Sequence, residues 1–157
     1  MGNFFCADLH LGHKRMVEFD KKRGPSRPFA NIDEHDSALI NGINNTCSGD
    51  DTLYVLGDVA MNSKYLHLLR QVNCRMHLVE GNHDIEDAQT YARHFYRVSG
   101  SRIFENFIAT HIPIHPMELT RFNVNVNVHG HLHNGIVRYD NGYKNPRYMC
   151  FHGTDRV

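Results

Sequence analysis

Val79-Glu80-Gly81-Asn82-His83-Asp84 closes a short apolar run and places three polar side chains directly after a glycine. A glycine at the end of a strand lets the backbone turn sharply. The residues beyond it then lie at the rim of a sheet, where side chains from several strands can converge on a ligand. Asn and Asp are also favoured turn residues, so this stretch taken alone is more typical of an ordinary turn.

Four further apolar runs end in the same way. Asp8-Leu9-His10 follows residues 4–7, Gly57-Asp58 follows residues 52–56, His111 follows residues 107–110, and Gly130-His131-Leu132-His133 follows residues 124–129. Turn chemistry does not explain why five apolar segments each end in a carboxylate, an imidazole or a carboxamide. The recurrence indicates a site built from strand ends.

The order of these blocks resembles the calcineurin-like metallophosphoesterase superfamily, which carries D-x-H, G-D, G-N-H-D/E, H and G-H-x-H along its chain. All of these blocks are present between residues 8 and 133. The resemblance implies an α/β fold, a four-layer αββα sandwich of two mixed β-sheets flanked by helices, with the motifs on loops at one edge. The second block departs from many relatives, because Val59-Ala60-Met61 lacks the Asp or Asn found there.

The hydrophobic pattern independently favours two packed sheets with helices outside them. We expect strands at 3–7, 52–57, 73–79, 95–98, 102–105, 107–110 and 124–129, helices at 32–45, 62–72 and 86–93, and irregular loops at 9–28 and around Pro113 and Pro116. Valines alternate with asparagines over residues 123–128, a half-buried strand pattern. Residues 136–139 and 147–151 are predicted to form a closing hairpin through Asp140-Asn141-Gly142.

Composition narrows the class of protein. At 157 residues the chain is expected to form one domain, residues 1–157, able to bury its own core. Lys+Arg and Asp+Glu number 17 each, so strong non-specific binding to nucleic acid or to an anionic membrane is not expected. No stretch has the length of a membrane span or the pattern of a signal peptide, and the four cysteines lack a C-x-x-C pair. A cytoplasmic protein is therefore expected.

The polar blocks supply a mixed set of metal donors. The candidate ligands are Asp8, His10, Asp58, Asn82, His111, His131 and His133. Carboxylate, imidazole and carboxamide donors without thiolate suit Mn, Fe, Zn or similar ions. Seven ligands exceed what one ion normally takes, whereas two ions that share one carboxylate would use them all. We expect two divalent ions, Mn²⁺ first, with Fe, Zn, Ni or Mg as alternatives.

The resemblance assigns a role to each donor. Asp58 bridges the two ions; Asp8, His10 and His133 complete one site, and Asn82, His111 and His131 complete the other. It also implies hydrolysis of a phosphodiester or phosphomonoester by a hydroxide held between the ions, which offset the charge that develops on the phosphoryl oxygens. His83 would stabilise the transition state or protonate the leaving oxygen, and Asp84 would orient its imidazole. An ordinary turn aspartate remains the alternative for Asp84.

The expected substrate is a small or exposed phosphoester, with nucleotides among the candidates. Arg27 opens an Arg-Pro-Phe tripeptide that resembles one in small members of the family, and its planar guanidinium suits a phosphate. Further substrate-binding candidates are His13, Lys14, Arg15 and His115. For each of these the alternative is a solvated residue or one that merely covers the site.

Two other functions stay open. A metal-dependent nuclease would use the same chemistry; balanced net charge and the lack of an accessory DNA-binding segment count against it, although the basic stretch 14–27 leaves room for it. A non-catalytic binding scaffold with the same fold is the alternative from another class. Relatives that lose the chemistry usually lose the histidine of G-N-H-D, and His83 is present.

Overall fold

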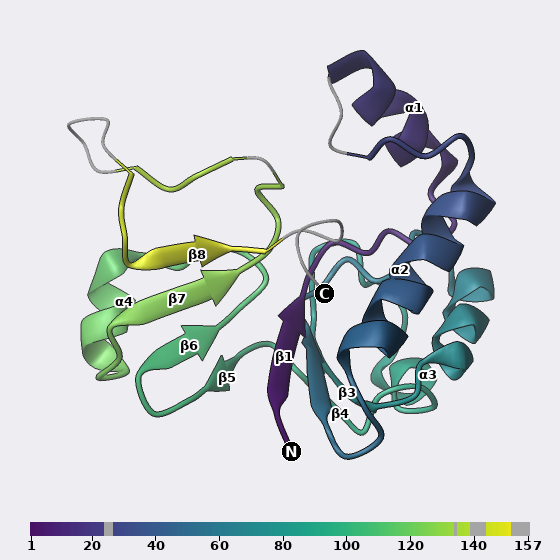
Figure 1. Ribbon diagram of the computed structural model, residues 1–157. Helices are drawn as coiled ribbons and strands as arrows, with labels where there is room; N and C mark the ends of the chain where they lie inside the picture. Colours follow the sequence, from purple (N-terminus) through teal and green to yellow (C-terminus); the bar gives the residue numbers. More distant parts are fainter. Residues whose placement is uncertain (24–26, 134, 139–143, 152–157) are drawn as a thin grey trace.

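Two four-stranded β-sheets with helices packed against them form the framework of this mixed α/β protein (Figure 1). The computed structural model describes residues 1–23, 27–133, 135–138 and 144–151. The first sheet contains β1 (Asn3–Cys6), β2 (Thr52–Val55), β3 (Arg75–Val79) and β4 (Arg97–Ser99), in that order and all parallel. The second contains β5 (Arg102–Ile103), β6 (Phe107–Ala109), β7 (Val126–His129) and β8 (Tyr148–Cys150).

The direction of the strands determines where the polar blocks lie. In the second sheet β5 runs antiparallel to β6, whereas β6, β7 and β8 are mutually parallel. Parallel neighbours present their carboxyl ends at one edge of a sheet, and ligands bind in the crevice outside such ends. Each polar block begins within a few residues of a strand end, after β1, β2, β3, β6 or β7.

Three apolar clusters hold these elements together. The first lies between the first sheet and the helices α2 (Ile32–Thr46) and η1 (Ser63–Gln71), and includes Ile43 and Leu69. The second lies between the two sheets and includes Leu56 and Val79. The third joins the second sheet to α4 (Pro116–Arg121) through Leu119. Continuous apolar strands such as β2 are covered on both faces, as expected for a parallel sheet.

Local sequence signals explain where α2 begins. Asn31 is the N-cap, and its side chain accepts a hydrogen bond from the backbone N–H of Glu34 at 2.9 Å. The Glu34 carboxylate reaches back to the N–H of Ala30 at 2.7 Å. These contacts satisfy amide groups that a helix start leaves unpaired, and they confirm the predicted start of this helix. None of the described helices is both long enough and apolar enough to span a bilayer.

Several predicted loops and strands differ in the structure. Residues expected to be irregular form α1 (Lys14–Arg23) and α4, while the predicted third early helix is reduced to α3 (Ala88–Tyr91). α1 was missed because its sequence is mostly polar; among its residues whose burial is described, Val17 is the buried apolar one. α4 was missed because Pro116 suggested a break, yet proline is well tolerated at the first helical position, where it needs no amide partner.

The closing hairpin also differs from the prediction. β8 pairs with β7 in parallel, and residues 136–138 contribute an isolated bridge between Arg138 and Lys144 in place of a strand. The turn predicted at Asp140-Asn141-Gly142 lies outside the described residues.

Asn127 is buried, although the alternation of valine and asparagine over residues 123–128 predicted a half-buried strand. It is fully buried on β7, where its amide nitrogen donates to the Ile108 carbonyl at 3.1 Å and to the Thr110 hydroxyl at 2.9 Å. Its amide oxygen accepts from the N–H of Ile114 at 3.0 Å. Asn127 thus ties β6 and the loop that follows His111 to β7, which a valine in its place could not do.

We predict that Asn127→Ala lowers the free energy of unfolding by about 1–3 kcal/mol, because buried partners lose their hydrogen bonds. Urea denaturation measures this change. Asn125→Ala is the control: its side chain is exposed on the same segment, so it should change stability by less than about 0.5 kcal/mol. Equal effects of the two substitutions would contradict the role assigned to Asn127.

Candidate metal centre

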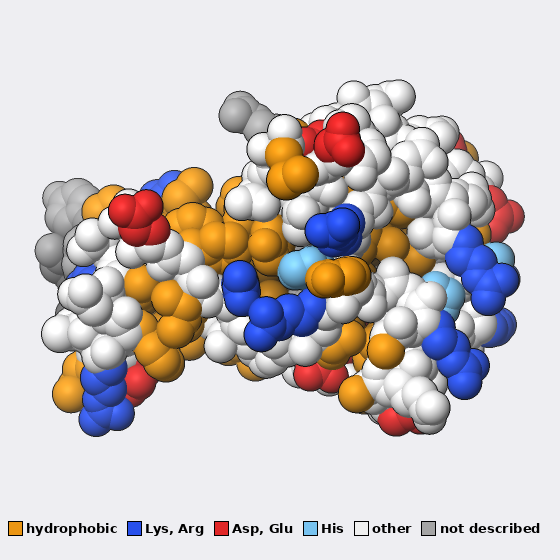
Figure 2. All heavy atoms as spheres, turned by 90° about the horizontal axis from the view of Figure 1, so that it is seen from below, with side chains coloured by type: hydrophobic (Ala, Val, Ile, Leu, Met, Phe, Trp, Pro, Cys, Tyr) orange, Lys and Arg blue, Asp and Glu red, His pale blue; other side chains and the backbone are white. Residues whose placement is uncertain are grey.

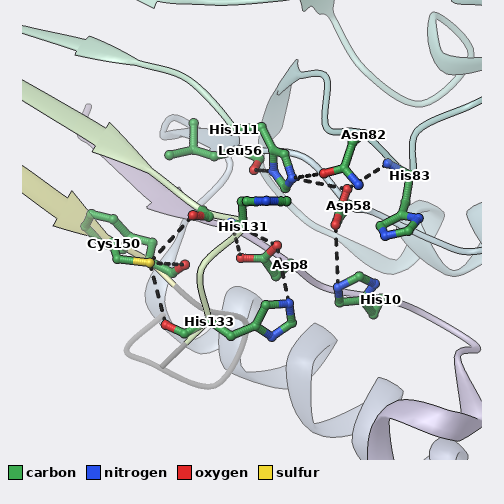
Figure 3. Close-up of polar contacts among 12 residues, drawn as sticks. Asp8, His10, Leu56, Asp58, Asn82, His83, His111, His131, His133 and Cys150 are labelled. Atoms are coloured by element: carbon green, nitrogen blue, oxygen red, sulfur yellow. Dashed lines mark hydrogen bonds and ion pairs between the residues drawn. The ribbon is translucent and has the colours of Figure 1, made fainter. Parts of the chain in front are cut away.

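All seven predicted ligands lie just beyond the strand ends and face a common region (Figure 3). Asp8, His10, Asp58 and His111 are each at most 3% exposed. His10 Nε2 lies 3.7 Å from Asp58 Oδ2, and His111 Nε2 lies 3.4 Å from Asp58 Oδ1. His133 Nε2 lies 3.9 Å from Asp8 Oδ1. Folding therefore brings together donors that are more than 120 residues apart in sequence.

Two overlapping groups of donors have the spacing of a metal site. Ligand atoms of Asp8, His10 and His133 all lie within 4.8 Å of one another, as do those of Asp8, Asp58 and His111. The first group matches three residues that the resemblance assigns to one ion. Asp8 belongs to both groups, whereas the resemblance gives the shared position to Asp58, so the bridging role of Asp58 stays a prediction.

The imidazole of His111 is oriented toward this region by the backbone. Its Nδ1 lies 2.8 Å from the carbonyl oxygen of Leu56, which can only accept, so Nδ1 carries the proton. Its Nε2 lies 2.9 Å from Asn82 Oδ1 and 3.4 Å from Asp58 Oδ1. One imidazole nitrogen and two side-chain oxygens therefore meet at this point. A carbonyl that fixes the tautomer of an imidazole is a frequent partner of metal-bound histidine.

His10 provides the test of whether the residues fit a metal. Both ring nitrogens of His10 are buried and have no hydrogen-bond partner among the described residues. Burial, followed by the nearby charge of Arg27, lowers the pKa of His10 to about 2, so its imidazole is neutral and retains a lone pair. Burial, followed by the charge of Asp58, raises the pKa of Asp8 to about 8. Unpartnered buried donors beside crowded carboxylates fit a cation site.

The backbone at these positions is strained. Five of the six described non-glycine residues with positive φ are predicted ligands, namely Asp8 (55°), His10 (48°), Asp58 (54°), His131 (67°) and His133 (49°). A left-handed conformation costs an L-residue roughly 1–2 kcal/mol. Such strain persists only where the surrounding structure imposes it, and it clusters at functional sites. The left-handed turns aim successive side chains into one region.

Hydrogen bonds hold the strained segments in place. The N–H groups of Asp8 and His10 donate to the carbonyls of Gly57 and Asp58 at 3.0 and 2.9 Å. The N–H of His131 donates to the Asp8 carboxylate at 2.9 Å. The loops after β1, β2 and β7 are therefore fixed to one another through backbone N–H groups and the carboxylate of Asp8.

Two glycines are required by close approach. A side chain at Gly57, where φ is 81°, would meet the ring of His111 at 2.5 Å and the Cα of Gly81 at 2.6 Å. A side chain at Gly81 would collide with the carboxylate of Asp58. Glycine in the G-D and G-N-H-D blocks thus lets the ends of β2 and β3 approach each other.

Asp84 has a different role from the predicted one. Its carboxylate accepts hydrogen bonds from the backbone N–H groups of Asp58, Val59 and Gly81 at 2.8–2.9 Å and makes none with the imidazole of His83. The prediction that Asp84 orients His83 is therefore wrong in this structure, because backbone amides occupy both carboxylate oxygens. Asp84 instead fixes the two glycine-containing loops to each other.

His83 lies beside Asp58 and His10 (Figure 3). Its backbone N–H donates to Asp58 Oδ1 at 3.0 Å, and its ring centroid is 6.0 Å from that of His10. The side chain is exposed and makes no hydrogen bond within the described part of the chain. Its imidazole is therefore accessible to a ligand.

Arg27 does not face solvent as a phosphate-binding residue would. It is 1% exposed, and its Nη2 donates to the carbonyl oxygen of Asp8 at 2.6 Å. Its Nη1 lies 3.1 Å from Nε2 of His35. Arg27 is therefore buried against Asp8 and supports the segment that carries this residue, whereas a contact with substrate was predicted.

His35 and Asp36 complete this support, and sequence analysis missed both. Arg27 can only donate, so Nε2 of His35 accepts and Nδ1–H donates to Asp36 Oδ1 at 2.8 Å. The other oxygen of Asp36 accepts from the N–H of Gly12 at 2.9 Å. The buried side chains of Arg27, His35 and Asp36 thus form a hydrogen-bonded relay. This relay holds both ends of the segment 8–12, which carries two predicted ligands.

The remaining candidates for substrate binding lie in different parts of the structure. The ring of His13 lies 5.6 Å from that of His10, and burial lowers its pKa, so it belongs to the cluster. Lys14 and Arg15 are exposed at the start of α1, and Lys14 lines a separate hollow with Glu18 and Asp33. His115 is exposed and caps α4 by accepting from the N–H of Met117 at 3.3 Å.

Comparisons with known proteins give relatives without an assigned activity. No protein-family model matches the chain. The Gene 66 protein of Mycobacterium phage L5 is 34% identical over 87 residues, which cover 52% of this chain and 39% of that protein. An uncharacterized protein of Methanocaldococcus jannaschii is 29% identical over 85 residues, covering 52% of this chain and 46% of the relative. The matched part thus spans less than half of these relatives.

The fold itself has a solved counterpart. The crystal structure of a protein of unknown function from Aquifex aeolicus matches with a TM-score of 0.71, and the match covers 98% of this chain and 90% of the other. The two sequences are 19% identical, so this likeness concerns the fold alone.

We predict that Asp36→Asn and Arg27→Lys each weaken Mn²⁺ binding by about 10- to 100-fold, because loss of a residue that orients ligands has effects of this size. Isothermal titration of the metal-free protein measures it. Asp33→Asn removes the same charge from an exposed position of the same helix and should bind Mn²⁺ as the unmodified protein does. An Asp36→Asn variant with undiminished affinity would refute the relay.

Proposed function

We propose that this protein is a dinuclear-metal-dependent phosphoesterase with the four-layer αββα sandwich of the calcineurin-like superfamily. The carrying observation is the convergence of carboxylates and imidazoles from the ends of β1, β2, β6 and β7, most of them with left-handed backbone, where the buried ring of His10 has no hydrogen-bond partner among the described residues. The three apolar clusters join the helices α2 and η1 to the first sheet, the first sheet to the second, and the second sheet to α4. This order of packing supports the four layers.

The residues present fit a pair of divalent ions. Asp8, His10 and His133 would hold one ion, and Asn82, His111 and His131 the other, with Asp58 between them. When bound, such a pair lowers the pKa of water and stabilises charge on the oxygens of a phosphoryl group. Neutral imidazoles and oxygen donors suit Mn²⁺ or a similar ion.

The exposure of the cluster determines how a phosphoester approaches. Asp8 and Asp58 are buried, whereas Asn82 and His83 are exposed. A phosphoester therefore enters beside His83, whose imidazole can carry a proton to the leaving oxygen at Nδ1 or Nε2. The hydrogen bond from the His83 N–H to Asp58 fixes the distance of this residue from the donors.

We expect the Mn²⁺-loaded protein to hydrolyse a generic bis-aryl phosphodiester or an aryl phosphate. Asp58→Asn and His111→Ala should abolish turnover and reduce bound metal, which elemental analysis measures. His83→Ala should keep its metal but lose about 10²- to 10⁴-fold in kcat, the usual contribution of a positioned proton donor.

His67→Ala is the matched control, since this histidine is exposed on η1 and bonds only the carbonyl of Lys64 among described residues. Retention of full turnover by His83→Ala would disprove its assigned role. A protein with bound metal that hydrolyses none of these esters would favour the non-catalytic scaffold.

A nuclease is the second candidate, and a basic cluster favours it. Arg75, Arg97 and Arg102 approach His77, whose pKa is lowered by burial and then by these three charges. Exposed Tyr96 stacks on His77 at 5.5 Å between ring centroids. The described residues supply no carboxylate within ion-pair distance of these arginines. In Figure 2, Lys and Arg side chains gather around a histidine near the centre of the face turned toward the viewer.

The position of this basic cluster suits a long ligand. Arg75 begins β3, whereas Asn82 follows the end of the same strand. At about 3.3 Å per residue, the two positions are roughly 20 Å apart, so one ligand that touched both would have to be a polymer. Arginines beside an exposed aromatic ring are typical of sites for single-stranded nucleic acid.

For this candidate we expect the triple variant Arg75→Gln, Arg97→Gln and Arg102→Gln to bind a labelled single-stranded oligonucleotide more weakly in fluorescence anisotropy. Its slope of log affinity against log salt should fall by about 2, because three phosphate contacts are lost. The triple variant Lys64→Gln, Arg70→Gln and Arg93→Gln loses the same charge elsewhere. Equal losses in both would show that the basic cluster is not a nucleic-acid site.

A further inference from the structure

A cavity of about 460 Å³ opens directly beside the candidate metal centre, with Asn82 and His111 in its wall. This volume lies within the range of small-molecule binding sites, roughly 300–1,000 Å³. Further lining residues come from the loop after β3, the link between β4 and β5, the second sheet and the end of α4. Because Asn82 and His111 belong both to the candidate centre and to this lining, a group attached to a phosphate at the centre can extend toward the cavity.

The far wall of the cavity is apolar although it is open to solvent. Ile112 is 49% exposed and Phe122 is 43% exposed, and both line the cavity together with Ile108 and Ile114. Single exposed apolar side chains are ordinary on a protein surface. Apolar side chains that share one concavity beside a polar centre are characteristic of a binding site.

The opposite wall is small and polar. Gly100 and Ser101, which join β4 to β5, leave this side of the cavity uncrowded. A Cβ added at Gly100 would meet no atom within 4 Å. Glu80 and Ser101 are also among the lining residues, and their side chains carry a carboxylate and a hydroxyl that can accept or donate hydrogen bonds. The cavity thus combines an apolar surface with a few polar groups.

We infer that this cavity is a subsite for an aromatic ring that is esterified to the phosphate, such as an aryl group or a nucleobase carried by its sugar. The inference rests on the proposed phosphoesterase function, because the phosphate places the ring. Phe122 supplies an aromatic edge or face for the ring, and Ile112 and Ile114 bury its apolar surface. The carboxylate of Glu80 offers an acceptor that a simple alkyl ester would leave unused.

The test uses ligands that cannot be hydrolysed and differ in one substituent. Phenylphosphonate and methylphosphonate carry the same phosphonate group, and their binding to the Mn²⁺-loaded protein is measured by isothermal titration. We expect phenylphosphonate to bind about 10-fold more tightly than methylphosphonate, in line with the discrimination that apolar pockets achieve. A nucleoside 5′-phosphonate in the same series shows whether a nucleobase or a simple aryl ring is preferred.

Two variants act on opposite walls of the cavity. Phe122→Ala removes the aromatic surface, and Gly100→Leu adds a bulky side chain to the lining at a position where a Cβ meets no atom within 4 Å. Each should bring the ratio of phenylphosphonate to methylphosphonate affinity close to one. Met117→Ala is the control: this side chain is 60% exposed on the same helix and does not line the cavity, so the ratio should not change.

The possible results distinguish a failure of the aromatic subsite from a failure of the proposed function. Equal affinities of both phosphonates for the unmodified protein, or an unchanged ratio in both cavity variants, would overturn the subsite while metal-dependent phosphonate binding still supports the phosphoesterase. Failure of every phosphonate to bind, together with absent ester hydrolysis, would overturn the proposed function and the subsite with it.

Discussion

The close packing of buried carboxyl groups and imidazoles is the constraint on which this structure depends. Asp8 and Asp58 are almost fully buried, and imidazole nitrogens of His10 and His111 lie 3.7 and 3.4 Å from the carboxylate of Asp58. Such an arrangement is unfavourable without positive charge, since buried charges normally persist only when they are paired or coordinate a metal. The buried cation Arg27 donates to the carbonyl oxygen of Asp8, so its guanidinium supports the loop. The centre of the cluster is thereby suited to cations from solution.

The rest of the fold imposes this arrangement against local preference. Left-handed backbone at five predicted ligands represents a cost of several kcal/mol, at roughly 1–2 kcal/mol per residue. Parallel strands, hydrogen bonds between loops and the Arg27–His35–Asp36 relay together offset it. Gly57 and Gly81 allow the two central strands to end close enough for Asp58 and His111 to meet. The fold itself therefore holds these side chains together.

Much of the fold and the donor set could be predicted from sequence, because both depend on local patterns. Apolar runs that end in Asp8, Asp58 or His111 mark strand ends, and parallel strands place such ends at one edge. The roles of Arg27, His35 and Asp84 could not be predicted, since each depends on a partner that folding brings near, such as the N–H of Asp58 for Asp84, 26 residues away. Polar α1 and proline-initiated α4 lack the apolar stripe from which helices are predicted.

The most direct measurement of the central claim is the anomalous diffraction of crystals soaked in manganese. The account predicts two peaks among Asp8, Asp58, His111 and the neighbouring donors, about 3.5–4 Å apart, as in other two-metal sites. The absence of any peak there, or imidazoles turned away from one another around empty density, would contradict it.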